Sequence, residues 1–304
     1  ETDSSSEQAL GTFSDLPLSP EIREAIEAIG YETPSPIQAE AIPHLAAGRD
    51  LLGVAQTGTG KTAAFALPLL SDLDTKAGGP QILCLAPTRE LAIQVAEAFE
   101  TFGQRMKNFR SLAIYGGDEY RRQIKGLREG AHVVVGTPGR MMDHLRKGTL
   151  KTDKIKALIL DEADEMLDLG FREDLEFILG KAPEDRRTLM FSATVPKAIA
   201  TLAKSYQRNA VRLTTSAEHK QHVDIEYRAL SVAPSDRENA IINVLRYFEV
   251  KSAIVFCATR AGVNRMTSRF TNRGFSVVAL SGELSQSERT HALQALRALG
   301  YMEP

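Results

Sequence analysis

Short apolar runs alternate with amphipathic stretches along roughly the first two thirds of the chain. Apolar runs bounded by turn residues are typical of buried strands, and apolar positions that recur about every three or four residues are typical of helices. Strands are predicted at Asp50–Val54, Gln81–Leu85, Ser111–Tyr115, His132–Val135, Lys156–Leu160 and Thr188–Phe191, and helices at Thr62–Leu73, Glu90–Met106, Glu119–Glu129, Arg140–Arg146 and Lys197–Tyr206. Two short helical patterns precede them, one in which Ile22, Ile26 and Ile29 recur before Gly30 and one at Pro36–Leu45. This alternation indicates βαβ units, so we expect an α/β fold in which helices cover both faces of a parallel sheet.

A second and shorter set of elements follows a polar interruption. Strands are predicted at Val223–Leu230, Ala253–Cys257 and Ser276–Leu280, and helices at Asp236–Tyr247, Gly262–Asn272 and Ser285–Leu299. We therefore expect four parts: a flexible Ser-rich and acidic tail at residues 1–10, a first domain at 11–207, a linker at 208–220 and an incomplete second domain at 221–304.

Composition narrows the class of protein. With 304 residues, 43% apolar and 25% charged, the chain matches folded soluble proteins and is long enough for two domains. Because the net charge is −2, the protein has no overall basic field, and a polyanion would be held by local sites. We find neither an apolar run long enough to span a membrane nor a signal peptide, and Cys84 and Cys257 lie far apart in apolar runs. These features predict a cytoplasmic protein that does not contact a membrane, and the histidines show no zinc-ligand spacing.

The turn after the first predicted strand has the composition of a phosphate-binding loop. It reads Ala55-Gln56-Thr57-Gly58-Thr59-Gly60-Lys61-Thr62 and leads into a helix. Glycines let successive backbone N–H groups face phosphates, Lys61 would carry charge to the β- and γ-phosphates, and the Thr62 hydroxyl would bind Mg²⁺. This predicts a nucleoside triphosphate site. Because Ala55 stands where the general pattern has glycine, a glycine-rich turn with a chance Lys-Thr pair is the alternative.

An acidic cluster follows the fifth predicted strand, with the sequence Asp161-Glu162-Ala163-Asp164. Carboxylates at the carboxyl end of a parallel strand face the crevice where such sheets bind ligands. Asp161 would hold Mg²⁺ through water, and Glu162 would orient the attacking water. A solvated acidic first turn of a helix is the alternative.

With these motifs in this order, the sequence resembles the DEAD-box ATP-dependent RNA helicases from Phe13 to about Arg297. The resemblance implies a RecA-like P-loop NTPase lobe followed by a partial second RecA-like lobe. It implies that the segment from Gly30 to Gln38 recognises adenine, with Gln38 offering a hydrogen-bond donor and an acceptor to the base. Tyr31 would stack on the base, and Phe13 would be the isolated aromatic residue upstream of this segment.

The resemblance also assigns a coupling segment and RNA contacts. Ser192-Ala193-Thr194 matches the segment that couples the ATP site to strand separation, and we expect Asp164 to link to Ser192 and Thr194. The implied RNA-binding residues are Pro87, Thr88, Arg89, Gly116, Gly117, Thr137, Gly139 and Arg140 in the first domain, and Thr259, Arg260, Gly282, Gln286 and Arg289 in the second. Helix caps, turns and solvated surface residues are the structural alternatives at these positions. The contacts would be to the backbone and 2′-hydroxyls, independent of base sequence.

Two later segments of the family are not found in these 304 residues: the Ala-Thr-Asp strand and the His-Arg-x-Gly-Arg segment that supplies arginine fingers. The sequence is therefore expected to be truncated before the last two helicase motifs. It is predicted to be an RNA helicase that couples RNA-stimulated ATP hydrolysis to local unwinding of RNA duplexes, with this chain binding ATP and RNA but impaired in turnover. The alternatives are a nucleotide- and RNA-binding module without net unwinding, and a P-loop ATPase that acts on DNA or protein. No protein partner is indicated.

Overall fold

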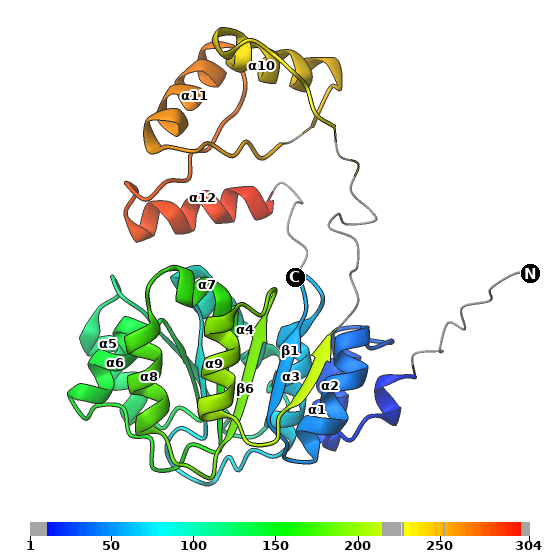
Figure 1. The fold of residues 1–304 in the computed structure, drawn as a ribbon, viewed down its shortest axis with the longest axis vertical. Coiled ribbons are helices and arrows are strands. Elements are labelled where there is room, and N and C mark those ends of the chain that lie inside the picture. Colours follow the sequence, from blue (N-terminus) through cyan, green and yellow to red (C-terminus); the bar gives the residue numbers. More distant parts are fainter. Residues whose placement is uncertain (1–10, 215–225, 227, 252, 299–304) are drawn as a thin grey trace, which may run out of the picture. The chain divides into compact units, whose positions relative to one another are not determined.

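The computed structural model describes residues 11–214, 226, 228–251 and 253–298. The chain divides into two compact units, Glu1–Lys220 and Gln221–Pro304, which are described separately (Figure 1). Within those described ranges, the structure contains no helix of the length and apolarity that crossing a membrane requires.

A parallel seven-stranded sheet forms the centre of the first unit (Figure 1). Its strands are β1 (Leu51–Val54), β2 (Ile82–Leu85), β3 (Ser111–Ile114), β4 (Val133–Gly136), β5 (Ala157–Leu160), β6 (Arg187–Ser192) and β7 (Val211–Thr214), in the spatial order β3-β4-β2-β5-β6-β1-β7. The predicted α/β fold with a parallel sheet is confirmed, and all six strands predicted for this unit are present.

Helices cover both faces of this sheet, because the strands are apolar on both sides. They are α1 (Pro20–Ala28), α2 (Pro36–Ala46), α3 (Lys61–Ser71), α4 (Arg89–Phe102), α5 (Tyr120–Arg128), α6 (Pro138–Arg146), α7 (Ala163–Asp168), α8 (Arg172–Lys181) and α9 (Lys197–Tyr206), preceded by a 3₁₀ turn, η1 (Phe13–Asp15). One core joins α1 to α4 with strand residues such as Ile159, and the other joins α5 to α9 with Leu158 and Leu160. Successive residues of one strand therefore serve opposite faces.

The order of the strands brings the predicted motifs together at one edge. β5, β6 and β1 are neighbours, and β2 lies beside β5. Because all seven strands are parallel, the segments that follow them emerge from the same edge of the sheet. The phosphate loop follows β1, the acidic cluster follows β5, and Ser192 ends β6.

Two predictions for this unit need correction. The expected linker at 208–220 contains β7, which pairs with β1 at the edge of the sheet. Arg212 and Thr214 are exposed while Leu213 is buried, and this half-exposed strand resembles polar linker in the sequence. The helices α7 and α8 were also not predicted, because no long apolar stripe marks the region between β5 and β6.

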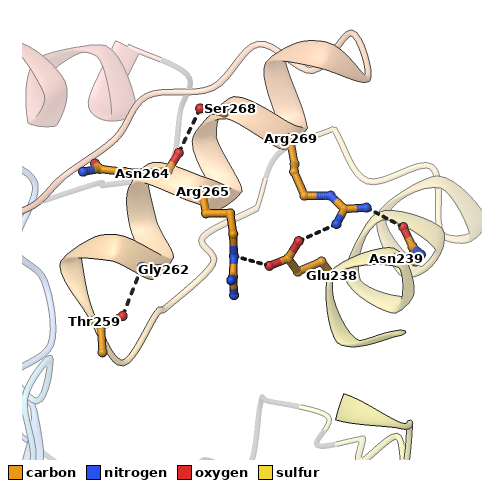
Figure 2. A network of polar contacts seen from close by, with 8 residues as sticks. All are labelled: Glu238, Asn239, Thr259, Gly262, Asn264, Arg265, Ser268 and Arg269. Carbon is orange, nitrogen blue, oxygen red and sulfur yellow. Dashed lines mark hydrogen bonds and ion pairs between the residues drawn. The ribbon is translucent and has the colours of Figure 1, made fainter. Parts of the chain in front are cut away.

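The second unit consists of helices α10 (Arg237–Tyr247), α11 (Arg260–Asn272) and α12 (Gln286–Ala298), with a 3₁₀ turn, η2 (Pro234–Asp236). Ile242, Met266 and Phe270 form a small core between α10 and α11. Figure 2 shows Glu238 of α10 between Arg265 and Arg269 of α11, with both N···O distances at 2.6 Å. Arg269 also donates to Asn239 over 2.8 Å, so polar contacts join the two helices beside their apolar core.

The strands predicted in the second unit are not formed in its described residues. Ala253–Cys257 and Ser276–Leu280 belong to no helix or strand and pair with no described strand, and the described part of Val223–Leu230 is not a strand either. Side chains do alternate along these segments: Val255 packs on the α10–α11 core, whereas Phe256 is 92% exposed. The sequence pattern captures this alternation, but a strand also needs a hydrogen-bonded neighbour.

Candidate functional site

The phosphate loop connects β1 to α3 with a tight backbone path. Ala55 is buried and its N–H donates to the carbonyl of Ser192 over 3.1 Å, which fixes the start of the loop against β6. Gly58 and Gly60 have φ values of 79° and 85°, in the left-handed region that favours glycine. A side chain at Gly60 would also collide with Gln38, because an added Cβ would lie 2.3 Å from its Nε2. Gln56 and Thr57 line the same turn, in which the Thr59 hydroxyl donates to the Gln56 carbonyl over 2.8 Å.

Lys61 is the first residue of α3, and its side chain is almost completely enclosed. It is 6% exposed, and the Nζ atom is buried with no hydrogen-bond partner among the residues that the structure describes. A buried ammonium without a partner is unfavourable unless an anion compensates it. Together with the N-terminus of α3, this position suits a phosphate group. Thr62 follows on the helix and remains half-buried.

The segment before α2 braces the loop from outside. Ser35 Oγ donates to the Thr59 carbonyl over 2.8 Å, and Gln38 Nε2 donates to the Gly60 carbonyl over 3.1 Å. Gln38 Oε1 in turn accepts the Ser35 N–H over 2.8 Å and caps α2. The amide was expected to face adenine, but here it holds the phosphate loop and keeps only one hydrogen and one lone pair for another partner.

The two aromatic residues expected near a base lie side by side. Phe13 and Tyr31 have ring centroids 5.9 Å apart, and Phe102 approaches Tyr31 edge-on at 6.1 Å. Phe13 is only 4% exposed, whereas Tyr31 is 37% exposed. Phe13 therefore supports Tyr31 from the core, and of the two rings only that of Tyr31 has substantial exposed surface.

The acidic cluster places one carboxylate deep in the fold. Asp161 is 3% exposed, and burial raises its pKa to about 6, while Lys61 opposes the rise and Glu162 adds to it. The Glu162 N–H donates to Asp161 Oδ1 over 3.1 Å, which also favours the charged form. Glu162 has a φ of 50°, a conformation that is strained for a non-glycine residue and that clusters at functional sites.

Asp164 connects the acidic cluster to the end of β6. Its Oδ2 accepts the Thr194 N–H over 3.0 Å and the Thr194 hydroxyl over 2.8 Å. Burial alone would raise the pKa of Asp164, but hydrogen bonds, chiefly those from Thr194, hold it below the usual value. Ser192 is fully buried and donates to the Thr194 carbonyl over 2.6 Å. The structure thus brings together the three residues that the sequence analysis links.

The first-unit residues predicted to contact RNA follow β2, β3 and β4, which are neighbours at one end of the sheet. Thr88 caps α4 by accepting the Leu91 N–H over 3.2 Å, and Pro87 beside it is buried. The Arg89 guanidinium covers the Gly116-Gly117 turn, since a Cβ added to Gly117 would lie 2.6 Å from Arg89 Nη1. Gly117 also has a φ of 89°, so a side chain is disfavoured there for two reasons.

Arg140 lies on the first turn of α6, after Thr137 and Gly139. Its Nη1 donates to the Asp118 carbonyl over 3.3 Å and to Gln123 Oε1 over 3.0 Å. The guanidinium also lies over the Tyr120 ring, 5.3 Å from its centroid. Sequence reasoning did not identify Gln123 or Tyr120, because a glutamine and a tyrosine on a basic helix carry no distinguishing spacing.

The second unit repeats part of this arrangement. Thr259 caps α11 by accepting the Gly262 N–H over 3.0 Å, as Thr88 caps α4 (Figure 2). Arg260 lies beside Gly282, where an added Cβ would be 3.5 Å from its Nη2, as Arg89 lies beside Gly117. Arg289 is half-buried on α12, and the Gln286 side chain lies outside the described residues.

The residues of the first unit fit a nucleotide with a divalent cation. Lys61 offers a buried positive charge at a helix N-terminus, and Asp161 and Thr62 offer the oxygen donors that Mg²⁺ prefers. Asp161 is adjacent to Glu162, a carboxylate that can accept a proton or orient water. This combination supports phosphoryl transfer to water.

Comparisons with known proteins agree with this chemistry. The family model described as DEAD/DEAH box helicase matches residues 35–202. The chain is 44% identical over 286 residues to the ATP-dependent RNA helicase DeaD of Escherichia coli K12, covering 94% of this chain and 46% of that protein. It is 46% identical over 286 residues to DeaD of Mycobacterium tuberculosis H37Rv, covering 94% of this chain and 50% of that one. The chain thus spans about half the length of the curated relatives it matches.

A solved structure shows the same fold. The crystal structure of a DEAD box protein from the hyperthermophile Methanococcus jannaschii matches with a TM-score of 0.66 at 38% sequence identity. The match covers 94% of this chain and 77% of the other. The matched length includes residues of both units, so the similarity extends beyond the first sheet.

Proposed function

Because the chain belongs to the DEAD/DEAH box helicase family, we propose that it is part of an RNA helicase that binds ATP and RNA and couples RNA-stimulated ATP hydrolysis to local unwinding of RNA duplexes. The observation that carries the proposal is the Lys61 ammonium at the N-terminus of α3, which is buried without a hydrogen-bond partner in the described part of the chain and is electrostatically coupled to Asp161. An ATP phosphate would compensate this charge.

Each residue of the candidate nucleotide site has a defined task in this proposal. Lys61 neutralises the β- and γ-phosphates, and the N–H groups of the phosphate loop bind their oxygens. Thr62 and Asp161 would hold Mg²⁺, which when bound neutralises charge on the phosphate oxygens. Glu162 orients the attacking water and accepts its proton. Tyr31 stacks on the base, and Gln38 couples base recognition to the loop through Gly60.

The path from hydrolysis to RNA runs through the end of β6. Asp164 is hydrogen-bonded to Thr194, which lies two residues after Ser192, where β6 ends. A conformational change at the acidic cluster would therefore also move the segment from Ser192 to Thr194. RNA would lie along the first turns of α4 and α6 and the Gly116-Gly117 turn, where N–H groups and arginines face its phosphates. Backbone contacts of this kind do not depend on base sequence.

A second candidate is nucleotide and RNA binding without net unwinding. These 304 residues contain no His-Arg-x-Gly-Arg segment, and an arginine finger contributes about 10³–10⁵ in rate in the P-loop GTPases. The segments Ala253–Cys257 and Ser276–Leu280 of the second unit also pair with no strand in the described residues. The two free cysteines agree with a reducing compartment, for which we propose the cytoplasm.

Steady-state ATP hydrolysis by the 304-residue chain, with and without RNA, distinguishes the two candidates. Glu162→Gln is the control, because it keeps the shape of the side chain and removes the base. RNA-stimulated hydrolysis well above that of Glu162→Gln supports coupled hydrolysis. Hydrolysis equal to the control, together with ATP and RNA binding, supports the binding candidate. Binding of DNA in preference to RNA of equal length would refute both.

A further inference from the structure

We propose that Gln123, on α5, is a positioning residue for RNA binding: its side-chain amide fixes Arg140 and the loop that carries Gly116 and Gly117 in one arrangement. The inference rests on the proposed function, in which Arg140 and that loop contact RNA phosphates. Gln123 itself would not touch RNA, because it is only 1% exposed.

All four hydrogen-bonding positions of the Gln123 amide are used. Its Nε2 donates to the Tyr115 carbonyl over 3.0 Å and to Asp118 Oδ2 over 3.1 Å. Its Oε1 accepts from Arg140 Nη1 and from His144 Nε2, both over 3.0 Å. An amide has two hydrogens and two lone pairs, so no capacity remains.

These contacts join two segments that are separate in the chain. Tyr115 and Asp118 belong to the loop between β3 and α5, whereas Arg140 and His144 lie on α6. The amide cannot rotate by half a turn without facing its oxygen toward the Tyr115 carbonyl and its hydrogens toward Arg140. A single orientation is therefore favoured, and it holds the loop and α6 together.

The orientation of Arg140 follows from this arrangement. Among the described residues, its Nη1 donates to Gln123 Oε1 and to the Asp118 carbonyl. The remaining donors of the guanidinium, on Nη2 and Nε, keep their capacity for a phosphate. Tyr120 supports the guanidinium from beneath, 5.3 Å from its ring centroid.

His144 strengthens the support behind Gln123. It is fully buried and stacks on Tyr120 with ring centroids 4.4 Å apart and planes 5° from parallel. Burial lowers the pKa of His144 to about 4, and Arg140 and Lys147 favour the neutral form further. Because an oxygen acceptor of Gln123 faces Nε2, a neutral ring carries its proton there, while Nδ1 faces the Thr149 hydroxyl at 2.8 Å.

The test measures RNA affinity of the full 304-residue chain as a function of salt. A short fluorescein-labelled single-stranded RNA is titrated by anisotropy, with Mg²⁺ and a non-hydrolysable ATP analogue present, between about 50 and 200 mM salt. The slope of log affinity against log salt is negative, and Arg140→Ala should reduce its magnitude by about 0.7, the value for one phosphate contact on a single strand. Gln123→Met should reduce the magnitude of the slope by the same amount and weaken binding about tenfold.

Three further variants separate positioning from general destabilisation. The double variant Gln123→Met, Arg140→Ala should bind no more weakly than Arg140→Ala alone, because both changes remove one contact. Gln123→Glu keeps an oxygen facing Arg140 but faces its second oxygen toward the Tyr115 carbonyl and Asp118 Oδ2, so it should release the loop and lower RNA affinity. Leu127→Ala, on the same helix and against the apolar core, should lower the melting temperature without changing the slope.

The outcomes distinguish this inference from the proposed function. A normal slope in Gln123→Met, when Arg140→Ala has a reduced one, overturns the inference alone. Additive losses in the double variant, or an unchanged RNA affinity in Gln123→Glu, overturn it as well. No RNA binding by the unchanged chain would overturn the RNA part of the proposed function and this inference together.

Discussion

Replacing Asp161 with asparagine should stabilise the first unit while it removes activity. Asp161 is 3% exposed at the end of β5, and the charged form of its carboxyl is destabilised by burial. Asparagine has almost the same shape and resembles the uncharged carboxyl. The variant therefore keeps the packing and avoids burying a negative charge.

The magnitude follows from the pKa of the carboxyl. Its usual value is 3.8 and its value in the fold is about 6, a difference of about two pH units, and each unit corresponds to about 1.36 kcal/mol. The raised pKa means that the folded state binds more protons between pH 4 and 6, so the free energy of unfolding falls as pH rises through this window. At pH 7 the loss is about 3 kcal/mol, and Asp161→Asn should avoid it. The melting temperature should rise by roughly 6–12 °C.

The assay is thermal unfolding followed by circular dichroism, from pH 4 to pH 8, with EDTA and no nucleotide. Asp161→Asn should exceed the unchanged chain in melting temperature most at pH 7 and above, and match it near pH 4. Asp153→Asn is the matched control, because the same substitution at an exposed residue before β5 should change neither stability nor its pH dependence. A variant that is less stable at pH 7, or a difference that does not depend on pH, would refute the reasoning.

Two further predictions concern the segments that join the nucleotide and RNA sites. Thr194→Val removes the 2.8 Å hydroxyl contact to Asp164 but keeps the N–H contact, so it should lower stability at pH 7 by about 1 kcal/mol. Because the pKa of Asp164 is depressed, calorimetry should show this loss above pH 4 and its disappearance below; a loss that persists there would contradict the assignment. Gly117→Ala imposes an unfavourable φ and displaces Arg89, so it should cost about 1–2 kcal/mol in stability and weaken RNA binding, with ATP affinity unchanged by titration. An unchanged RNA affinity would show that this turn does not contact RNA.

The strands and most helices of the first unit could be predicted because their apolar residues are continuous and local. Lys197–Tyr206, for example, is a helix with the bounds that its pattern predicts. β7 could not be predicted, because an edge strand with one buried residue has too few apolar positions to stand out. Its pairing with β1 depends on residues about 160 positions away in the chain.

The candidate site shows the same limit. The phosphate loop and the acidic cluster are contiguous motifs and could be located from sequence. What the residues do within the site depends on contacts across the fold: Gln38 holds Gly60, and Phe13 is enclosed in the core rather than open to a base. Gln123 has no motif at all, and only its four partners identify it.

The most direct test of the central claim is an equilibrium titration of a fluorescent ATP analogue with Mg²⁺ onto the 304-residue chain and its Lys61→Ala variant. Lys151→Ala, at an exposed lysine, is the matched control. The account predicts saturable binding by the unchanged chain and by Lys151→Ala, and loss of binding in Lys61→Ala with the fold intact by circular dichroism. Equal affinity in all three proteins would show that the buried Lys61 ammonium does not hold the nucleotide phosphates, and would contradict the account.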